Sequence, residues 1–242
     1  MRPPTQDDPT GRTEHRLLHK LPAVDKLLPR LVAIVVLSVA WVAMTMAIAA
    51  GLFTSFDYQV AAATHSIWQE SLHGVFQVIA ELGGLELTTI LMLGLFIYLW
   101  RGGFGADALT VLAFAGAVAL EVFYKFLFFH PGPPRSISHR DGPSLTDLFT
   151  GSGLGNSFPS GHMVRAVVAY GLLAFVIRRL APSRAVGLLA IVVAILIIVV
   201  LAFDRLYMNV HWESDVIGGL LLGGIALMAA TVWLDRPRKT EN

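Results

Sequence analysis

The chain has 242 residues, of which 55% are hydrophobic and only 14% are charged, and its formal net charge is +1. Soluble domains carry about 25% charged residues, so this chain lacks the polar surface of a water-soluble protein. The composition also excludes a disordered chain and a coiled coil, and the near-neutral charge gives no reason to expect a nucleic-acid partner. The chain contains no cysteine, which excludes a disulfide scaffold, a thiolate nucleophile and a cysteine metal site. These exclusions leave an integral membrane protein.

Apolar segments of membrane-spanning length recur along the chain. The first, Leu31 to Phe53, has 23 residues without a charge and exceeds the ~7–15 apolar residues of a secretory signal, so we expect a retained anchor. The later segments are Gly83–Trp100, Ala108–Phe123 with a continuation towards Lys125, Ser160–Ile177, Ala185–Phe203 and Val216–Leu234. Together they predict an all-α, polytopic membrane bundle of six transmembrane helices.

The positive charges orient this bundle. Six spans place both termini on one side of the membrane, and the segments on that side hold 13 lysine and arginine residues. The opposite side holds five, so the termini are predicted to be cytoplasmic. We therefore expect a cytoplasmic N-terminal segment over residues 1–30, the membrane domain over 31–234 and a cytoplasmic tail over 235–242. The five outer residues are Lys125, Arg135, Arg140, Arg165 and Arg205.

The first outer connection, residues 54–84, carries no basic residue. Within it, residues 66–82 place apolar side chains at helical spacing, which predicts a short interfacial helix lying flat on the outer membrane surface. The other two outer connections concentrate the cations and also hold His130, His139, His162 and His211. This concentration favours an outward-facing anion site over scattered cations that reach for lipid headgroups.

The first polar cluster surrounds Lys125, at the outer end of a predicted helix. Glu121 precedes it by four residues, so the two side chains share a helix face and can form an ion pair. Lys125 is either a phosphate ligand or simply the partner that makes Glu121 tolerable in the membrane.

The second cluster is a glycine-rich stretch, Gly151 to His162, that runs into the fourth predicted span. A glycine-rich loop that opens a helix exposes backbone N–H groups to an anion. Ser160 adds a hydroxyl donor, and His162 can give or take a proton. The alternative is an ordinary helix start with Ser160 as its N-cap and a solvated His162, and this stretch alone slightly favours that alternative.

The third cluster leads into the last predicted span. His211 and Asp215 are four residues apart, so one helical turn brings them together. A carboxylate that holds one imidazole nitrogen fixes the tautomer and directs the other nitrogen towards a substrate. Arg205 can hold phosphate oxygens with its planar fork. Alternatively, His211 caps the helix and Asp215 is a favourable first-turn acid.

Together the three clusters resemble the type 2 phosphatidic acid phosphatase family, whose motifs are Lys-x6-Arg-Pro, Pro-Ser-Gly-His and Ser-Arg-x5-His-x3-Asp. Residues 159–162 match the second motif fully. The third motif is matched by Arg205, His211 and Asp215, and the ends of the first by Lys125 and Pro133.

Two positions depart from the pattern. Gly132 stands where the first motif has arginine, and Asp204 stands where the third has serine. Arg165, one turn after His162, is the first candidate to replace the arginine, and Arg135 is the second. Arg165 can alternatively reach the lipid headgroups. Asp204 can orient Arg205 by pairing with it.

The resemblance implies a two-step phosphoryl transfer without a metal or other cofactor. His211 is the implied nucleophile and forms a phosphohistidine, Asp215 orients it, and His162 protonates the leaving oxygen and then helps activate water. The implied substrate-binding groups are Lys125, Ser160, Gly161, Arg205 and, as the replacement, Arg165.

The implied activity is hydrolysis of a lipid phosphate or pyrophosphate at the outer face of a bacterial plasma membrane. Undecaprenyl pyrophosphate, phosphatidylglycerol phosphate and phosphatidic acid are the candidate substrates, and polyprenyl pyrophosphate is preferred by analogy with small relatives. A headgroup transferase that uses the same histidine pair is one alternative. A non-catalytic membrane protein that binds lipid phosphate is another. The sequence does not define an oligomeric state.

Overall fold

The structure, a computed structural model, describes residues 27–139 and 156–236, and the regular elements within these ranges are helices. Five helical segments in the described ranges are long and apolar enough to cross a membrane. They are Leu27–Ala49, Glu70–Arg101, Gly105–Leu127, Arg184–Tyr207 and Glu213–Leu234. The predicted all-α membrane fold is confirmed at this level.

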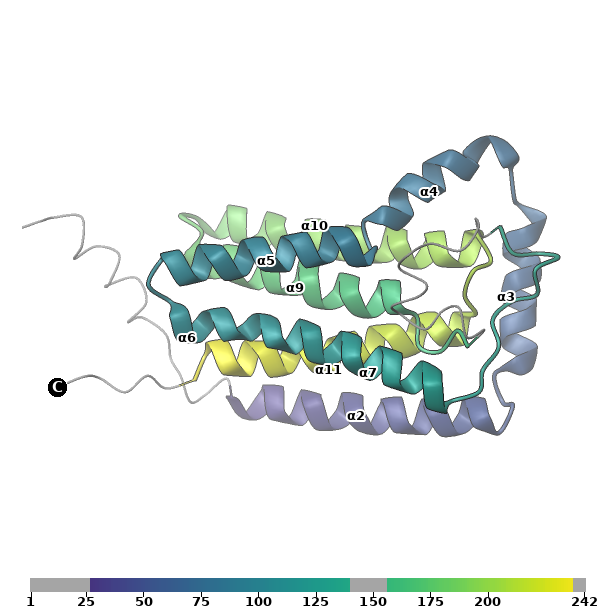
Figure 1. Cartoon of the computed structure of the whole chain (residues 1–242), viewed down its shortest axis with the longest axis horizontal. Coiled ribbons are helices and arrows are strands. Elements are labelled where there is room, and N and C mark those ends of the chain that lie inside the picture. The colour runs from purple at the N-terminus through teal and green to yellow at the C-terminus, as the bar shows by residue number, and fades with distance from the viewer. Residues whose placement is uncertain (1–26, 140–155, 237–242) are drawn as a thin grey trace, which may run out of the picture.

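The long helices form a bundle (Figure 1). Along its axis run α2 (Leu27–Ala49), α5 (Leu85–Arg101), α7 (Leu112–Leu127), α9 (Gly161–Leu180), α10 (Arg184–Tyr207) and α11 (Glu213–Leu234). Two short elements, α6 (Gly105–Ala108) and η2 (Leu109–Val111), lead into α7. At the right-hand end in Figure 1, α3 (Thr54–Ser66) crosses the bundle, and α4 (His73–Glu81), which follows η1 (Glu70–Leu72), leans away from it.

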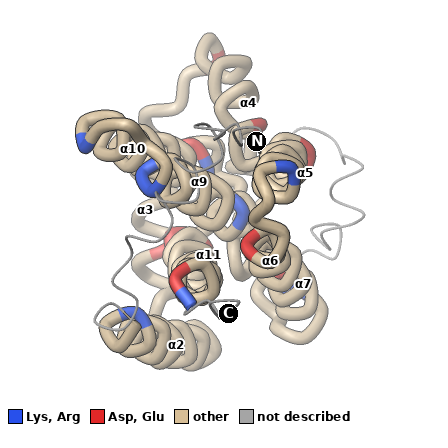
Figure 2. Tube along the Cα trace, turned by 90° about the vertical axis from the view of Figure 1, so that its left-hand side faces the viewer, with Lys and Arg blue, Asp and Glu red and all other residues tan. Residues whose placement is uncertain are grey.

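Helix α9 is the core of the bundle. It packs against α5, α7, α10 and α11, and it lies among them in the end view of Figure 2. Val164, Val168 and Leu172 on this helix are completely buried. The predicted fourth span is therefore a helix, but it is not one of the five apolar candidates. Its sequence carries Arg165, Arg178 and Arg179, which lower its hydropathy.

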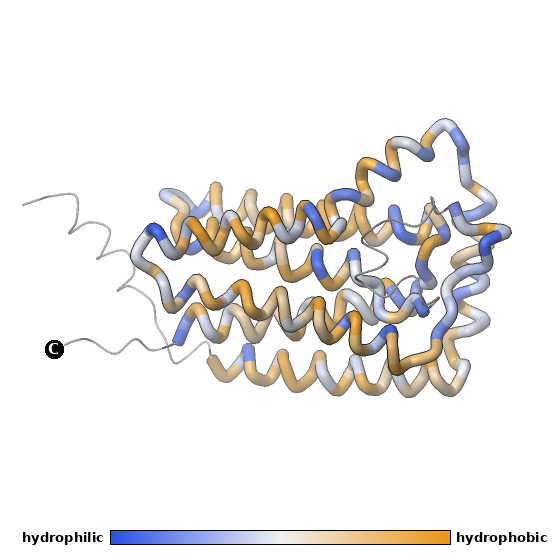
Figure 3. The backbone as a smooth tube through the Cα atoms, in the orientation of Figure 1, coloured by the Kyte–Doolittle hydropathy of each residue, from blue (hydrophilic) through white to orange (hydrophobic). Residues whose placement is uncertain are grey.

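The outward faces of the other long helices are apolar. Val35 on α2, Ile90 on α5 and Leu188 on α10 are each more than 60% exposed. Figure 3 shows that hydrophobic positions dominate along the bundle axis, whereas hydrophilic positions gather mostly at its two ends. Such a continuous apolar surface is unfavourable in water and fits the hydrocarbon core of a bilayer. The chain is an integral membrane protein.

Close contact between α9 and α11 depends on two glycines of α11, Gly219 and Gly223. A Cβ atom at Gly219 would lie 2.5 Å from the Ser160 carbonyl oxygen, and one at Gly223 would lie 2.8 Å from Val167 Cβ. No larger residue fits at this helix–helix distance. The two glycines therefore let the start of α9 lie directly against α11.

The first outer connection is more structured than predicted. Helix α2 ends at Ala49 rather than at Phe53, and Gly51 adopts a φ of +73° in the turn that follows. Helix α3 comes next and was not predicted, because its side chains lack an amphipathic pattern. The helix predicted over 66–82 corresponds to η1 and α4 and begins at Glu70. Its flat position on the membrane surface stays a prediction.

The opposite end of the bundle is closed by ion pairs. Asp235, after the end of α11, pairs with Arg30 of α2 and with Arg179 of α9. These contacts connect the helix ends of three different segments. Most of the predicted N-terminal segment 1–30 and most of the tail 235–242 lie outside the described residues.

Candidate active site

The three polar clusters meet at the end of the bundle that α3 crosses. The backbone N–H of Ser157 donates to the His130 carbonyl oxygen at 2.8 Å, which connects the first cluster to the second. The backbone N–H of Ser160 donates to the Asp215 carbonyl oxygen at 3.0 Å, which connects the second to the third. The glycine-rich positions 151–155 and Arg140 lie outside the described residues.

His211 and Asp215 come together as their spacing predicts. Helix α10 closes through Asn209, whose left-handed φ of +49° turns the chain towards α11. His211 Nδ1 then lies 3.3 Å from Asp215 Oδ2, and the backbone N–H of Trp212 donates to the same oxygen at 2.9 Å. His211 is 7% exposed and Asp215 is fully buried. The carboxylate therefore serves both as a helix cap and as the partner of one imidazole nitrogen.

His162 stands between two guanidinium groups in the first turn of α9. Its Nε2 lies 3.5 Å from Arg205 Nη1, and its Nδ1 lies 3.5 Å from Arg165 Nη2. The ring is half-buried rather than solvated. The backbone N–H of Ser160, two residues before His162, donates to the carbonyl oxygen of Asp215, whose carboxylate lies beside His211, so the two histidines belong to one cluster.

Glu121 holds two of the cations. Its Oε1 lies 2.9 Å from Lys125 Nζ, and its Oε2 lies 3.0 Å from Arg165 Nη1. Arg165 Nε also donates to the Gly83 carbonyl oxygen at 3.1 Å. Arg165 is only 2% exposed, so the alternative in which it reaches the lipid headgroups is wrong. The predicted pair between Glu121 and Lys125 is confirmed, and Arg165 shares the same carboxylate.

Ser160 and Gly161 open α9 directly against these charges. Ser160 occupies the N-cap position of α9, as the alternative expected, but its side chain makes no capping hydrogen bond. Its hydroxyl is buried, and no described residue is its hydrogen-bond partner. A Cβ atom at Gly161 would lie 1.8 Å from Glu121 Oε1, so only glycine leaves room for the carboxylate.

The two departures from the family motifs have different outcomes. Asp204 is buried and accepts a 2.6 Å hydrogen bond from Arg205 Nε, so the expected pair forms. At Gly132 a Cβ atom would lie 3.3 Å from Ser157 Cβ. Arg135 is exposed, and among the described residues no ion pair joins it to the cluster. Of the two candidates to replace the motif arginine, only Arg165 lies in the cluster.

The fixed charges of the site balance. Each cation lies in the same cluster as a carboxylate, so a protonated histidine would give the site a net positive charge for an incoming phosphoryl group. Within the described ranges, no group of three or more histidine and carboxylate side chains has the arrangement of a metal site. The three cations are Lys125, Arg165 and Arg205, and the three carboxylates are Glu121, Asp204 and Asp215.

Sequence reasoning missed two side chains next to these groups. One is His130, whose Nε2 lies 3.4 Å from Asp215 Oδ1. Its position between Lys125 and Gly132, inside the first motif, is the sequence feature that could have drawn attention to it. Asp57 on α3 accepts hydrogen bonds from the N–H and the hydroxyl of Ser214. Burial raises the pKa of Asp57, and the hydrogen bonds from Ser214 oppose that shift. No sequence pattern pointed to Asp57.

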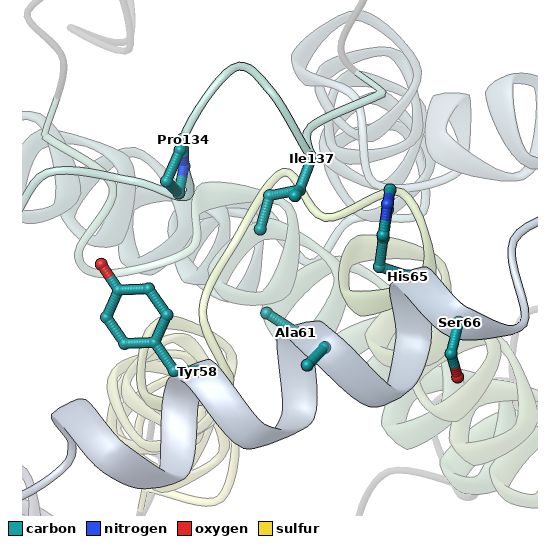
Figure 4. Close-up of a pocket in the computed structure, with 7 residues that line it drawn as sticks. Tyr58, Ala61, His65, Ser66, Pro134 and Ile137 are labelled. Atoms are coloured by element: carbon teal, nitrogen blue, oxygen red, sulfur yellow. The ribbon is translucent and has the colours of Figure 1, made fainter.

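An apolar pocket of about 370 Å³ lies beside the cluster, between α3 and the connection over residues 131–139 (Figure 4). None of the polar residues described above lines it. Its lining consists of Tyr58, Ala61, Ala62, His65, Ser66, Pro134 and Ile137.

Comparison with known proteins places this arrangement in a family. The model of the PAP2 superfamily matches residues 104–239, which is more than half of the chain and includes all three clusters. The chain belongs to the PAP2 superfamily. This membership confirms the resemblance found in the motifs. Helix α3, with Asp57, lies outside the matched range.

Named PAP2 relatives and a solved structure agree with this assignment. The Escherichia coli (strain K12) protein YbjG, whose name provisionally describes an undecaprenyl-diphosphatase, is 31% identical over 61% of this chain and 68% of its own. Phosphatidylglycerophosphatase B of Bacillus subtilis (strain 168) is 29% identical over 70% of this chain and 78% of its own. The crystal structure of a transmembrane PAP2-type phosphatidylglycerolphosphate phosphatase from Bacillus subtilis matches with a TM-score of 0.67 and 26% identity, covering 82% of this chain and 94% of that one.

Proposed function

We propose that this protein is a membrane phosphatase that hydrolyses a lipid phosphate or pyrophosphate through a phosphohistidine intermediate. The observation that carries the proposal is the convergence of His211, held by Asp215 at 3.3 Å, and His162, held between Arg165 and Arg205. One imidazole is oriented as a nucleophile, and the other is surrounded by groups that attract phosphoryl oxygens.

In the first step, His211 Nε2 attacks the phosphorus atom. A nitrogen–phosphorus bond forms while the bond from phosphorus to the leaving oxygen breaks, and His162 gives its proton to that oxygen. Asp215 Oδ2 accepts the Nδ1–H bond and stabilises the positive charge that develops on the His211 ring. The product of this step is phosphohistidine and a lipid alcohol or a lipid monophosphate.

In the second step, His162 takes a proton from water, and the hydroxide oxygen attacks phosphorus. The nitrogen–phosphorus bond breaks, inorganic phosphate leaves and His211 is regenerated. Such a reaction needs positioning and stabilisation of spread negative charge more than further covalent chemistry. Lys125, Arg165 and Arg205 supply the charge, and the Ser160 hydroxyl and the Gly161 N–H supply neutral donors.

The substrate class follows from the surroundings of this cluster. The apolar outward faces of the long helices fit the tail of a membrane lipid, whose headgroup would then reach the cluster at the bundle end. The named relatives act, according to their names, on undecaprenyl diphosphate or on phosphatidylglycerophosphate. We propose undecaprenyl pyrophosphate first, with phosphatidylglycerol phosphate and phosphatidic acid as the other candidates.

The proposal includes six membrane spans, with both termini cytoplasmic and the cluster at the outer face of a bacterial plasma membrane. Five spans are supported by length and hydropathy. The sixth is α9, which runs alongside the others and whose Arg165, near the cluster, is buried by the protein. The excess of lysine and arginine on the terminal side supports the orientation.

The test is phosphate release by detergent-purified protein from undecaprenyl pyrophosphate, with EDTA present. We expect release by the wild-type protein and none above background by His211→Ala. Equal release by that variant would remove His211 as the nucleophile, and dependence on a metal would appear as loss of activity in EDTA. Exchange of the headgroup onto an added alcohol in excess of phosphate release would instead favour a transferase, and binding without turnover would favour a non-catalytic protein.

A further inference from the structure

The carboxylate of Asp215 lies between two imidazole rings rather than beside one. Its Oδ2 is 3.3 Å from His211 Nδ1, and its Oδ1 is 3.4 Å from His130 Nε2. The two distances are nearly equal, and Asp215 is fully buried. Oδ1 makes no hydrogen bond within the described residues, and a buried carboxylate oxygen without a donor is costly, so His130 Nε2 is the nearest side-chain nitrogen that could satisfy it.

His130 is held in this position by its own neighbours. Its carbonyl oxygen accepts hydrogen bonds from both the N–H and the hydroxyl of Ser157, and its N–H donates to Asn156 Oδ1. The ring lies against the aromatic rings of Phe128 and Phe158. Within the described residues neither His130 Nε2 nor Asp215 Oδ1 makes a hydrogen bond, and these two buried atoms face each other at 3.4 Å. Hydrogen bonds therefore hold the His130 backbone, two phenylalanine rings pack beside the imidazole, and its Nε2 is directed at Asp215.

The charges of the cluster suggest why the approach of His130 to Asp215 matters. The three fixed cations of the cluster are matched by three carboxylates, and Gly132 supplies no side chain where the first motif has arginine. His130 stands two residues before Gly132 and faces the carboxylate that orients His211. His130 Nε2 meets Oδ1, the carboxylate oxygen that His211 does not contact.

We infer that His130 is a positioning residue of the proposed phosphatase reaction, acting through Asp215. Its Nε2–H holds Oδ1, so that Oδ2 stays on His211 Nδ1 and His211 Nε2 stays aimed at the phosphorus atom. The inference rests on the proposed function, because it assigns His130 a part in the reaction of His211. It adds a third histidine to a site whose motifs name two.

The test compares His130→Gln and His130→Ala with His65→Gln in the purified protein, using undecaprenyl pyrophosphate as substrate. A Gln amide keeps an N–H donor for Asp215, whereas Ala keeps none. We expect His130→Ala to lower kcat about tenfold or more with KM within about twofold, because the group acts on the reacting geometry rather than on binding. The kcat of His130→Gln should lie at least about halfway, on a logarithmic scale, between that of His130→Ala and that of the wild type. His65 is an exposed α3 histidine, and its variant should retain wild-type turnover.

A second measurement separates positioning from a structural role. When Asp215→Asn is already present, adding His130→Gln should not lower kcat further, because the carboxylate through which His130 acts is gone. Equal losses for His130→Gln and His130→Ala, or equal losses with and without Asp215, would overturn the inference. So would wild-type kcat for His130→Ala. If the wild-type protein itself releases no phosphate, the proposed function fails instead.

Discussion

Asp57 on α3 accepts two hydrogen bonds from Ser214, one from the backbone N–H at 2.9 Å and one from the hydroxyl at 2.8 Å. Ser214 is the second residue of α11, and Asp215 follows it directly. The helix that crosses the bundle end therefore fixes the start of the helix that carries the site carboxylate. This relationship connects a segment outside the matched family range to the proposed chemistry.

We expect Asp57→Ala to lower the free energy of unfolding by about 1–3 kcal/mol, because it leaves two buried donors of Ser214 without an acceptor. Phosphate release should fall as well, since the start of α11 loses its anchor. Thermal unfolding in detergent and the phosphate assay measure the two effects. Gln59→Ala, at an exposed position of the same helix, is the matched control. Equal behaviour of the two variants would show that Asp57 does not anchor α11.

The ionisation of Asp57 predicts a pH effect with a definite sign. Burial raises the pKa of Asp57 above its ordinary value of 3.8, so the folded chain holds this proton more tightly than the unfolded chain. The contribution of Asp57 to stability therefore falls as the pH rises from about 4 through the folded pKa. Asn cannot ionise, so Asp57→Asn should gain in melting temperature relative to the wild type over this pH range. A difference that does not change with pH would contradict this prediction.

Gly161→Ala should abolish most of the activity. The added methyl group would meet Glu121 Oε1 at 1.8 Å and Arg165 Nη1 at 2.7 Å, so the ion pair between them must separate. We expect phosphate release to fall by about 100-fold, because both groups support the cations around the phosphoryl group. Gly116→Ala on α7 is the control, since a Cβ atom there meets nothing within 4 Å. Similar activity in the two glycine variants would count against the close packing at Gly161.

Arg165→Ala tests whether this residue replaces the arginine absent at Gly132. The guanidinium bridges Glu121, the Gly83 carbonyl oxygen and His162, and we expect its loss to reduce turnover by about 100-fold. Arg165→Lys should not restore it, because an ammonium group lacks the planar fork. Arg178→Ala, at an exposed position near the other end of α9, should be close to wild type. Near-normal turnover of Arg165→Ala would show that Arg165 does not replace the motif arginine.

The orientation can be tested by labelling, because the chain has no cysteine of its own. Gln59→Cys on α3 and Ser183→Cys before α10 introduce single exposed thiols at opposite ends of the bundle. We expect a membrane-impermeant maleimide to label the first in intact cells and the second only after permeabilisation. The reverse pattern would place the cluster on the cytoplasmic side.

The sequence predicts local relationships well in this chain. The four-residue spacings of Glu121 with Lys125 and of His211 with Asp215 become contacts, because a helical turn fixes them without knowledge of the fold. Apolar length likewise predicts the long helices. The fourth predicted span is present as α9 although its arginine residues lower its hydropathy, because neighbouring helices bury Arg165.

What the sequence could not supply are contacts between distant segments. Arg165 meets Glu121 across 44 positions, and Asp57 meets Ser214 across 157. No spacing rule reaches that far in a single sequence. Helix α3 was missed for a different reason, because its surroundings, not an amphipathic pattern, determine which side it buries. His130 was visible only as one of several outer histidines until the fold placed it on Asp215.

The account depends most on His211 carrying the phosphoryl group. Protein mixed with undecaprenyl pyrophosphate and quenched in base within the first turnover can be digested and analysed by mass spectrometry. We predict a phosphoryl group on the His211 imidazole in the wild-type protein and its absence in His211→Ala. Turnover with an unmodified His211, or with the phosphoryl group on another residue, would contradict the proposed mechanism.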